Sequence, residues 1–374
     1  MTARLQLLEN GLAVRRRLAD AFAAAAGSIC MVMYIFADDA AGQSVLAELV
    51  AAARRGVPVR IIVDGFGSGA TSDRFFAPLA AAGGQVRRFN TVWHPRYLFR
   101  NHQKFVIVDA SIALTGGFNI AEDYFGDGVT AGWRETGLAV EGEAAAALQG
   151  YFDGMWEALG RGEARLREIA RLPVAAGKEN EGEGTGTVEW VIGAPGIRRG
   201  AYDRRLRRDL IACSRLSVLM AYFTPPARFR RMIGRIARRG AVELVVPQQS
   251  DIAIARYAAW YTFRRLLRDG CRIHEYLPRP LHAKLIVADD VVYAGSANLD
   301  FRSLHLNFEM SLRVRDPALA AEVRGLIRHD IARSRPITQE YYDRNTDWWR
   351  RFLRWAAYSF LNRIDYYLTR RFLD

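Results

Sequence analysis

One pattern of residues occurs twice in this chain. The stretch "HQKFVIVDASIALTGGFNIAED" (102–123) parallels "HAKLIVADDVVYAGSANLDFRS" (282–303), and the two leading histidines are 180 residues apart. Two further pairs follow the same order: "MYIFADD" from Met33 with "MAYFTPP" from Met220, and residues 49–68 with residues 233–251. Three ordered matches at a nearly constant offset indicate a duplicated unit.

Each copy reads as helices alternating with buried strands. Residues 49–68 and 233–251 both run from a helical pattern through Arg-Arg-Gly into an apolar stretch, as a helix, its cap and a strand would. We therefore predict an α/β fold of two homologous lobes, each with a mostly parallel or mixed sheet flanked by helices. The predicted division is a first lobe at 1–174, a Gly- and Glu-rich linker at 175–187, a second lobe at 188–340 and a C-terminal segment at 341–374.

Lysine is rare in this chain, and its positions are informative. The 53 basic residues include only three lysines, Lys104, Lys178 and Lys284. Lys178 falls in the predicted linker, where a surface charge is expected, but Lys104 and Lys284 each stand two residues after a histidine. On a strand, residues i and i+2 share a face, so each lysine projects beside its histidine. A compact ammonium suits a phosphoryl oxygen in a tight pocket, which favours a functional over an incidental pairing.

Other polar residues also recur at matched places in the two copies. Each histidine and lysine is followed by an aspartate, and then by a turn of small residues that ends in an asparagine. We expect the two asparagine amides and one serine hydroxyl to donate to phosphate oxygens, and a later pair of glutamates to orient the histidines through their second ring nitrogen. These residues are Asp109 and Asp289, Asn119 and Asn298, Ser296, and Glu135 and Glu309.

Composition limits the partners and the compartment. The net charge is +13, which favours an anionic partner such as nucleic acid, an anionic membrane surface or a phosphorylated substrate. The three cysteines are widely spaced, so we expect buried free thiols in place of disulfides or a zinc site. The uncharged stretch 21–37 is too short for a membrane span and predicts a helix, a turn and a buried strand. No signal peptide and no transmembrane helix are expected.

The doubled pattern His-x-Lys-x4-Asp, each followed by Gly-x-x-Asn, resembles the phospholipase D superfamily. The sequence segments "NHQKFVIVD…GGFNIAEDY" and "GSANLDFRSLHLNFE" are similar to those of bacterial cardiolipin synthases, of the shorter type without N-terminal transmembrane helices. The resemblance covers most of residues 10–335. It implies that the two lobes share one active site at their interface, with His102, Lys104, Asp109, His282, Lys284 and Asp289 as catalytic residues.

The resemblance also implies a mechanism. His102 would attack phosphorus and form a phosphohistidine, while His282 would act as general acid and then as general base. The phosphate would be bound by Lys104, Lys284, Asn119, Asn298 and Ser296. No metal or cofactor is expected. The implied reaction transfers a phosphatidyl group from one phosphatidylglycerol to another, giving cardiolipin and glycerol. The residues themselves treat the two histidines alike and do not identify the acceptor.

The C-terminal stretch 347–374 contains three Trp, three Tyr and three Phe with arginines between them. This composition suits a membrane interface, so we predict peripheral attachment on the cytoplasmic side of the membrane, with phosphatidylglycerol and cardiolipin as lipid partners. A terminal helix packed on the protein's own core is the alternative for this segment. For function, a phospholipid hydrolase and a superfamily nuclease or phosphodiesterase remain alternatives. Nucleic acid is disfavoured because the aromatic residues are concentrated in one terminal segment instead of along a groove.

Overall fold

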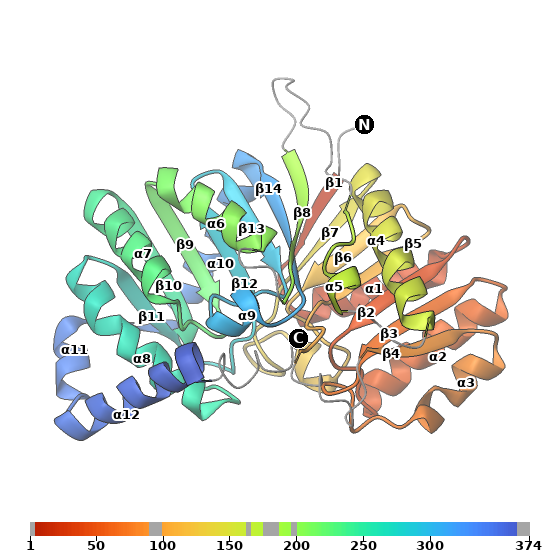
Figure 1. Cartoon of the computed structure of the whole chain (residues 1–374), viewed down its shortest axis with the longest axis horizontal. Helices are drawn as coiled ribbons and strands as arrows, with labels where there is room; N and C mark the ends of the chain where they lie inside the picture. Colours follow the sequence, from red (N-terminus) through yellow and green to blue (C-terminus); the bar gives the residue numbers. More distant parts are fainter. Residues whose placement is uncertain (1–3, 90–98, 162–165, 175–186, 196–199, 365–374) are drawn as a thin grey trace.

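The computed structural model describes residues 4–89, 99–161, 166–174, 187–195 and 200–364. The predicted linker at 175–187 lies outside these residues except for Thr187, which is the first residue of a strand, and residues 365–374 of the C-terminal segment also lie outside them. The remaining residues form two α/β lobes that lie side by side (Figure 1), so the predicted fold class is confirmed.

The first lobe contains a sheet of seven strands in the order β1-β7-β6-β5-β2-β3-β4. Its elements are β1 (Arg4–Leu8), α1 (Gly11–Ala24), β2 (Ile29–Met33), α2 (Ala40–Arg54), β3 (Val59–Asp64), η1 (Asp73–Phe76), α3 (Ala77–Ala81), β4 (Gln85–Phe89), β5 (Phe105–Val108), β6 (Ile112–Gly116), η3 (Glu122–Tyr124), β7 (Gly137–Glu141), α4 (Glu143–Gly160) and α5 (Leu166–Ile169). Strands β2, β3 and β4 are parallel, and the other neighbours pair antiparallel.

The second lobe contains a sheet of eight strands in the order β15-β11-β10-β9-β12-β13-β14-β8. Its elements are β8 (Thr187–Gly193), α6 (Ala201–Ala212), β9 (Arg215–Met220), α7 (Ala227–Arg239), β10 (Ala241–Pro247), α8 (Ala253–Arg268), β11 (Arg272–Tyr276), β12 (Lys284–Ala288), β13 (Val291–Gly295), α9 (Phe301–His305), β14 (Glu309–Arg315), α10 (Pro317–Ala332), β15 (Ser334–Ile337), α11 (Gln339–Arg344), α12 (Trp348–Ser359) and η4 (Phe360–Ile364). Helix α11 crosses the predicted boundary between residues 340 and 341.

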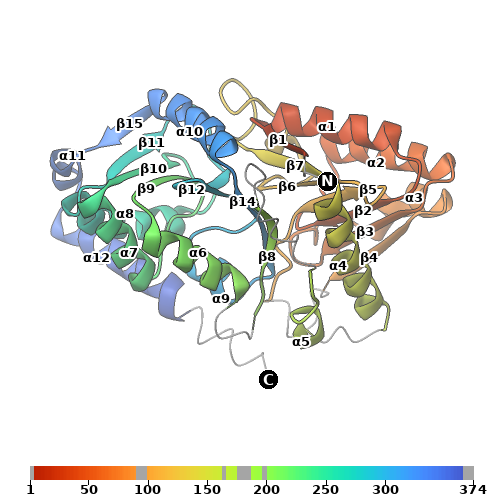
Figure 2. The same ribbon diagram turned by 90° about the horizontal axis from the view of Figure 1, so that it is seen from above.

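The two sheets repeat one topology. The strands of the two sheets correspond one to one in order and direction when β8-β14-β13-β12-β9-β10-β11 is aligned with β1-β7-β6-β5-β2-β3-β4. The second sheet has one additional strand, β15, at its edge. Seen from above, α1 and α2 lie diagonally opposite α6 and α7, and α4 lies diagonally opposite α10 (Figure 2). The lobes are therefore related by an approximate two-fold axis along that view.

Three apolar clusters hold the layers together. One packs α1 and α2 on the outer face of the first sheet, and a second packs α6, α7 and α8 on the outer face of the second sheet. The third fills the space between the sheets, where Ile107 of β5 and Leu285 of β12 belong to the same cluster as the apolar faces of α4 and α10. A continuous buried core joins the lobes, which fixes the position of one lobe relative to the other.

The local signals in the sequence correspond to the elements observed. Helices α2 and α7 both end at Arg-Arg-Gly, and Gly56 after α2 has a positive φ of 89°. The uncharged stretch 21–37 is divided between the end of α1 and the fully buried β2, as predicted. All three cysteines are buried and free. Among the described residues, no helix is both long and apolar enough to cross a membrane.

Candidate active site

The two histidines lie where the lobes meet, at the carboxyl ends of β2 and β9. Lys104 directly precedes β5, which pairs with β2, and Lys284 pairs with Met220 at the end of β9. The backbone N–H of His102 donates to the carbonyl of Phe308 over 2.9 Å, and that of His282 donates to the carbonyl of Arg134 over 2.9 Å. Each of these bonds joins one lobe to the other, so the histidine segments are positioned by the opposite lobe.

The glutamates follow directly after the residues that accept those bonds. Glu309 therefore faces His102, with each carboxylate oxygen 3.1 Å from Nδ1, and Glu135 faces His282, with Oε2 2.7 Å from Nδ1. The predicted orienting role is thus matched by contact, and in both cases the carboxylate comes from the other lobe. The structure brings the two half-sites together through these crossed pairs.

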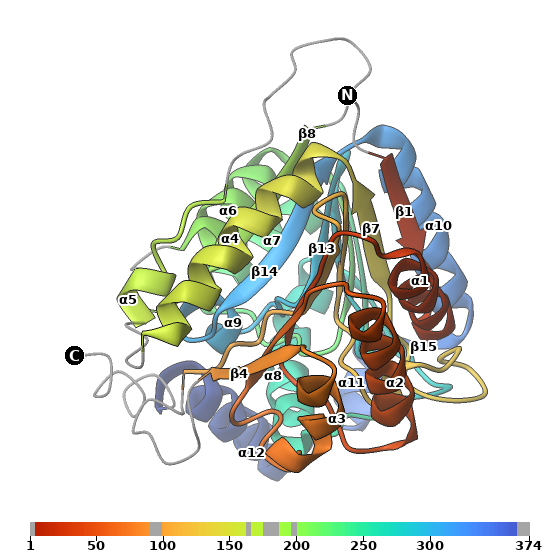
Figure 3. The same ribbon diagram turned by 90° about the vertical axis from the view of Figure 1, so that its right-hand side faces the viewer.

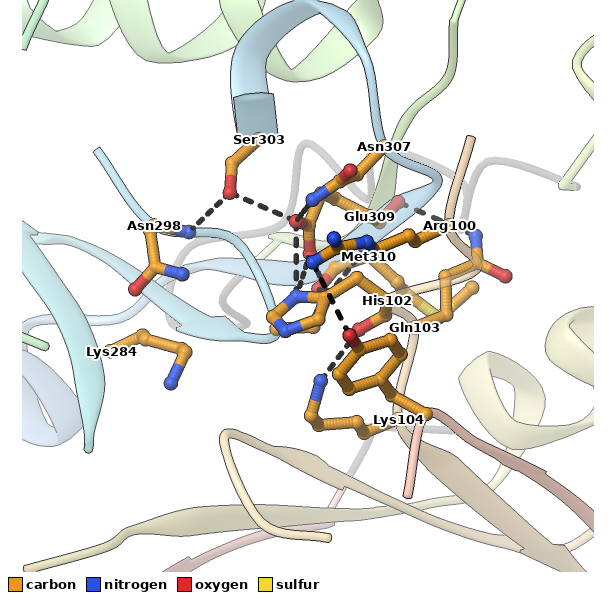
Figure 4. A network of polar contacts seen from close by, with 12 residues as sticks. Arg100, His102, Gln103, Lys104, Lys284, Asn298, Ser303, Asn307, Glu309 and Met310 are labelled. Atoms are coloured by element: carbon orange, nitrogen blue, oxygen red, sulfur yellow. Dashed lines mark hydrogen bonds and ion pairs between the residues drawn. The ribbon is translucent and has the colours of Figure 1, made fainter. Parts of the chain in front are cut away.

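Glu309 is held by donors on three sides (Figure 4). The hydroxyl of Ser296 donates to Oε2 over 2.5 Å, and the hydroxyl of Ser303 donates to Oε1 over 2.9 Å. The amide of Asn307 donates to Oε1 over 3.2 Å. Since the carboxylate accepts all of these bonds, Nδ1 of His102 carries the hydrogen that faces it, and Nε2 presents its lone pair to the site.

Glu135 has a smaller set of neighbours. Its Oε1 accepts from the N–H of Thr136 over 2.9 Å, and a Cβ at Gly117 would lie 2.5 Å from the same oxygen. The glycine in the turn of the first lobe is therefore required by the close approach of this carboxylate. The Nζ of Lys284 lies 2.9 Å from Nδ1 of His282 and 2.5 Å from its carbonyl oxygen.

Both lysines are buried and face the histidines. Lys104 has no exposed surface and Lys284 is only 3% exposed. The Nζ of Lys104 donates to the carbonyl of His102 over 2.8 Å, and Figure 4 shows the two lysines and Asn298 around the His102 ring. Among the described residues, the oxygen atoms that accept from these ammonium groups are the carbonyl oxygens of the two histidines.

Burial shifts the pKa values of the whole group. Desolvation and the neighbouring Lys104 hold the pKa of His102 well below its usual range, and desolvation with Lys284 lowers that of His282 to about 4. Desolvation also lowers the pKa of Lys104 to about 7 and that of Lys284 to about 8. In the free protein both imidazoles are therefore neutral, which is the form required of a nucleophile.

The two glutamates differ in their pKa. Burial raises the pKa of Glu309 to about 7, against the opposing effects of Lys104 and its three hydrogen-bond donors. Burial acts in the same direction on Glu135, but the hydrogen bond from His282 and the charge of Lys284 outweigh it and lower the pKa. Glu135 is thus the more firmly ionised carboxylate, and its partner His282 is the histidine better supported as an imidazolium.

The two asparagines occupy equivalent positions beside the site. The side-chain oxygen of Asn119 accepts from the N–H of Ile35 over 3.1 Å, and that of Asn298 accepts from the N–H of Tyr222 over 3.4 Å. These bonds assign the oxygen of each amide to the backbone and direct the NH₂ group elsewhere. A phosphate-binding role for both amides remains a prediction. The Asn119 side chain also hydrogen-bonds to Tyr124.

Ser296 departs from its predicted role. Its hydroxyl is fully buried, donates to Glu309 and accepts the N–H of Met310 over 3.0 Å. The single hydroxyl hydrogen is therefore already used, and the residue orients the carboxylate where we had expected it to bind phosphate. The position of Ser296 in the repeat, two residues before Asn298, indicates that it lies near the site but does not identify the partner of its hydroxyl.

Asp109 and Asp289 lie at the far ends of β5 and β12, away from the histidines. The carboxylate of Asp109 accepts from the N–H groups of Ala26, Gly27 and Ser28 over 2.6–3.0 Å. Asp289 does the same for Ser214 and Arg215. We expected both among the catalytic residues, and in the structure each carboxylate holds the turn between a helix and the first inner strand of its lobe.

Several residues at the site were not predicted from the sequence. The buried carboxylate of Asp64 accepts from the N–H of Asn101 over 2.7 Å, which fixes the residue before His102. Aromatic rings surround the imidazoles, with Tyr34 at 4.8 Å from His102, and Tyr124 at 5.1 Å from His282, between ring centroids. None of these residues recurs at the matching position of the other copy. A comparison of the two copies detects only residues that recur, so it could not find them.

A buried ion pair fastens the lobes next to the site. The guanidinium Nε of Arg134 lies 2.9 Å from Asp330 on α10, and both side chains are almost fully buried. In the other half-site the equivalent contact is apolar, because Phe308 packs its ring on Phe89. The two half-sites are therefore similar in their reactive groups and different in their supports.

Taken together, two lobes of one topology present two neutral imidazoles and two lysines to a common centre. Two imidazoles, each with a buried lysine beside it, suit nucleophilic displacement at a phosphodiester, with one ring attacking and the other handling the proton. The fold and site define a two-lobed protein of the phosphodiester-transfer class. Among the described residues, no group of three or more His, Cys, Asp or Glu is placed to hold a metal ion.

Comparison with known proteins identifies the family. Residues 18–156 and 210–331 match the family described as "Cardiolipin synthase, PLD-like domain", and the chain belongs to this family. Cardiolipin synthase 1 of Staphylococcus aureus (strain MRSA252) is 30% identical over 316 residues, which cover 83% of this chain and 63% of the relative. Cardiolipin synthase of Geobacillus kaustophilus is 34% identical over 287 residues, covering 74% of this chain and 56% of the relative. The chain thus spans somewhat less than two thirds of the length of these relatives.

Solved structures share the fold. Phosphatidylserine synthase of Haemophilus influenzae superposes with a TM-score of 0.79 at 14% identity, over 98% of this chain and 94% of that one. Polyphosphate kinase of Porphyromonas gingivalis superposes with a TM-score of 0.59 at 14% identity, over 97% of this chain and 53% of that one. At this level of identity the likeness concerns the fold alone.

Proposed function

We propose that this protein is a cardiolipin synthase, which transfers a phosphatidyl group from one phosphatidylglycerol to a second one and releases glycerol. The observation that carries the proposal is the crossed arrangement in which Glu309 contacts His102 and Glu135 contacts His282. Such a site needs both lobes, and it would place one histidine on each side of a bound phosphodiester. The named relatives in the same family, called cardiolipin synthases, support the choice of substrate.

In the first step Nε2 of His102 attacks the phosphorus atom, and the bond to the glycerol oxygen breaks. His282 gives its proton to that oxygen, so free glycerol leaves and a phosphatidyl group remains on His102. The bound phosphodiester adds a negative charge between Lys104 and Lys284, which raises the pKa of His282 from its low value in the free protein. The ionised Glu135 on the other ring nitrogen supports the same imidazolium.

In the second step a hydroxyl of another phosphatidylglycerol enters. His282, now neutral, takes its proton while the oxygen attacks phosphorus, and the bond to His102 breaks. The products are cardiolipin and the free enzyme. One phosphodiester replaces another, so no external energy source is consumed. Lys104, Lys284 and the amides of Asn119 and Asn298 would stabilise the charge on the non-bridging oxygens in both steps.

We further propose that the protein acts as a peripheral protein on the cytoplasmic face of the membrane. Helix α12 lies beside α8 at the lower end of the molecule in Figures 1 and 3, and β9 points toward this end in Figure 1. Its outer side carries exposed aromatic rings, with Trp348 exposed by 78% and Trp349 by 51%. The opposite side packs on the protein, where the hydroxyl of Tyr358 donates to the carbonyl of Pro225 over 2.9 Å. The packed side corresponds to the alternative of a terminal helix on the protein's own core, and the exposed aromatic side supports the proposed membrane attachment.

The reaction is tested by incubating purified protein with phosphatidylglycerol vesicles and following cardiolipin and glycerol by mass spectrometry. We expect both products in equal amounts, and neither with His102→Ala or His282→Ala. Phosphatidic acid in place of cardiolipin would make the protein a hydrolase. Cleavage of single-stranded DNA without any lipid product would make it a nuclease.

Membrane attachment is tested separately, with the double variant Trp349→Ser/Phe352→Ser on the exposed face of α12. We expect weaker sedimentation with anionic vesicles, because each removed ring takes apolar area out of the interface. Unchanged sedimentation would show that the aromatic face does not contact lipid. A variant at Leu353, which is half-buried on the same helix, serves as the control for the folding of α12.

A further inference from the structure

A basic hollow lies away from the active site, between α8, α11 and α12. Its volume is about 250 Å³, and three guanidinium groups line it, from Arg256 on α8 and from Arg350 and Arg354 on α12. The aromatic lining comes from Tyr257, Trp260 and Tyr341, and Asn345 completes it; no Asp or Glu is among the lining residues. A cavity of this kind combines positive charge with hydrogen-bond donors and lacks an internal counter-charge.

The arginines are held mainly by neutral acceptors, and the one ion pair that they make among the described residues is long and exposed. Arg354 is fixed by hydrogen bonds to Thr346 over 2.5 Å and to the carbonyl of Asn345 over 3.0 Å, and its guanidinium stacks 4.3 Å from the Trp260 ring centre. Arg350 reaches Asp347 only at 3.6 Å, with both side chains more than half exposed. The Nε of Arg256 is buried without a hydrogen-bond partner. Guanidinium groups that converge on a hollow with no carboxylate in its lining, one of them with a buried donor that has no partner among the described residues, are suited to bind an anion.

Phosphate is the anion that fits these groups best. Arginine forks bind phosphate oxygens in pairs, and three forks from two helices surround a tetrahedral group better than a planar carboxylate. The source of the phosphate is indicated by the other face of α12. The rings of Trp349, Phe352 and Trp355 contact one another in sequence, at centroid distances of 5.6 and 5.8 Å, and all three are about half exposed. A helix with such a face lies at a lipid surface, next to phosphodiester headgroups.

We propose that this hollow is a second lipid site, which binds the phosphate of an anionic phospholipid headgroup in the bilayer that α12 contacts. The site is distinct from the histidine centre and takes no part in the chemistry. It would fix the orientation of the protein on the membrane, because α12 lies toward the end of the molecule at which β9 ends (Figure 1), and Lys284 pairs with the last residue of β9. The inference goes beyond the proposed reaction and does not require it to be correct.

The test compares two double variants of equal charge. Arg256→Gln/Arg350→Gln removes two of the lining charges and leaves the structural Arg354 in place. Arg268→Gln/Arg351→Gln removes one arginine from each of the same two helices, at exposed positions that do not line the hollow. Both variants lose the same general attraction to an anionic surface, which is about 1 kcal/mol per basic residue. Any difference between them therefore reports the hollow.

Binding is measured by sedimentation with phosphatidylcholine vesicles that contain a minor fraction of phosphatidylglycerol. We expect the lining variant to bind at least about tenfold more weakly than the control variant, because charged hydrogen bonds contribute about 1.5–3 kcal/mol each and 1.4 kcal/mol is tenfold. Calorimetry with soluble glycerophosphoglycerol should show binding to the wild-type protein and to the control variant, and none to the lining variant. Circular dichroism establishes that both variants are folded.

Two results would overturn the proposal. Equal vesicle binding by the two variants, together with calorimetric binding of inorganic phosphate to the wild-type protein and the control variant but not to the lining variant, would make the hollow a site for free phosphate. Equal behaviour in both measurements would show that the hollow binds no phosphate. Since these are binding measurements, they remain decisive even if the protein makes no cardiolipin, and a failure of the proposed reaction would be seen separately in the product assay.

Discussion

The carboxylate of Glu135 lies 2.7 Å from Nδ1 of His282, although the two residues belong to different lobes and are separated by 147 positions in the chain. The reciprocal pair, Glu309 and His102, spans 207 positions. Neither lobe contains a complete histidine–carboxylate pair of its own. A single lobe could not orient its histidine for catalysis, which explains why the duplicated unit has its site at the interface.

The crossed pairs predict the effect of Glu135→Gln. The amide can keep the contact with Nδ1 but loses the charge that supports an imidazolium, so we expect kcat to fall by about 10² to 10⁴ with little change in KM. Steady-state kinetics over a pH series measures this. Thr136→Ser serves as the control, since it keeps the backbone N–H that binds Glu135. A rise in KM with kcat retained would mean that the carboxylate contributes to substrate binding.

The lysines should not be replaceable by arginine. Lys104 and Lys284 are almost completely buried, so the larger planar guanidinium of Lys104→Arg or Lys284→Arg does not fit beside the histidine. We expect each variant to lower kcat by at least about 100-fold. Lys178→Arg, in the predicted linker, provides the matched control and should keep wild-type kinetics. Near-normal activity of Lys104→Arg would show that charge alone is needed there.

The turn-holding role of Asp109 and Asp289 predicts a loss of stability instead of a loss of chemistry. Asp109→Asn weakens three hydrogen bonds to backbone N–H groups, and we expect the free energy of unfolding to fall by about 1–2 kcal/mol with kcat unchanged. Urea unfolding measures the first quantity. Asp290→Asn, an exposed neighbour of Asp289, is the control.

The contribution of Asp109 to the free energy of unfolding should depend on pH in one direction. Burial acts to raise the pKa of Asp109, but the hydrogen bonds from Ala26, Gly27 and Ser28 outweigh it and hold the pKa below its usual value. The stabilisation is therefore present above the unfolded pKa of about 4 and is lost as the pH falls below it. A stability difference between wild type and Asp109→Asn that grows on acidification would contradict this assignment.

The activity should have an alkaline limit set by the lysines. Desolvation lowers the pKa of Lys104 to about 7 and that of Lys284 to about 8, so both lose their protons in the free enzyme as the pH rises through this range. We expect kcat/KM to fall as the pH rises above about 7. His102 is already neutral well below pH 6.5, so the acidic limb lies lower than an ordinary histidine would place it. A profile that stays flat from pH 7 to 9.5 would show that the lysines keep their protons throughout.

Much of this architecture follows from the repeat within the sequence. The repeat predicted two equivalent lobes, the strands that carry Lys104 and Lys284, and the proximity of Glu135 and Glu309 to the histidines. It did not predict which glutamate meets which histidine. That pairing depends on how the lobes dock, and a comparison of equivalent positions contains no information about docking.

The errors have the same physical origin. Asp109 recurs in both copies because every lobe needs its helix–strand turn held, and recurrence does not separate a structural requirement from a chemical one. Asp64 and Arg134 were missed for the opposite reason, since each supports one half-site only. Repetition within a chain detects what the halves share, while the asymmetric supports become visible only in three dimensions.

The covalent intermediate on His102 is the most direct test of the proposed chemistry. The wild-type protein is mixed with phosphatidylglycerol, quenched at alkaline pH during turnover and digested, and the peptides are analysed by mass spectrometry. The account predicts a phosphatidyl group on the peptide that contains His102, and none on this peptide in His102→Ala or in His282→Ala, which lacks the general acid for the first step. A modification found on the His282 peptide of the wild-type protein, or on neither peptide while cardiolipin is still produced, would contradict it.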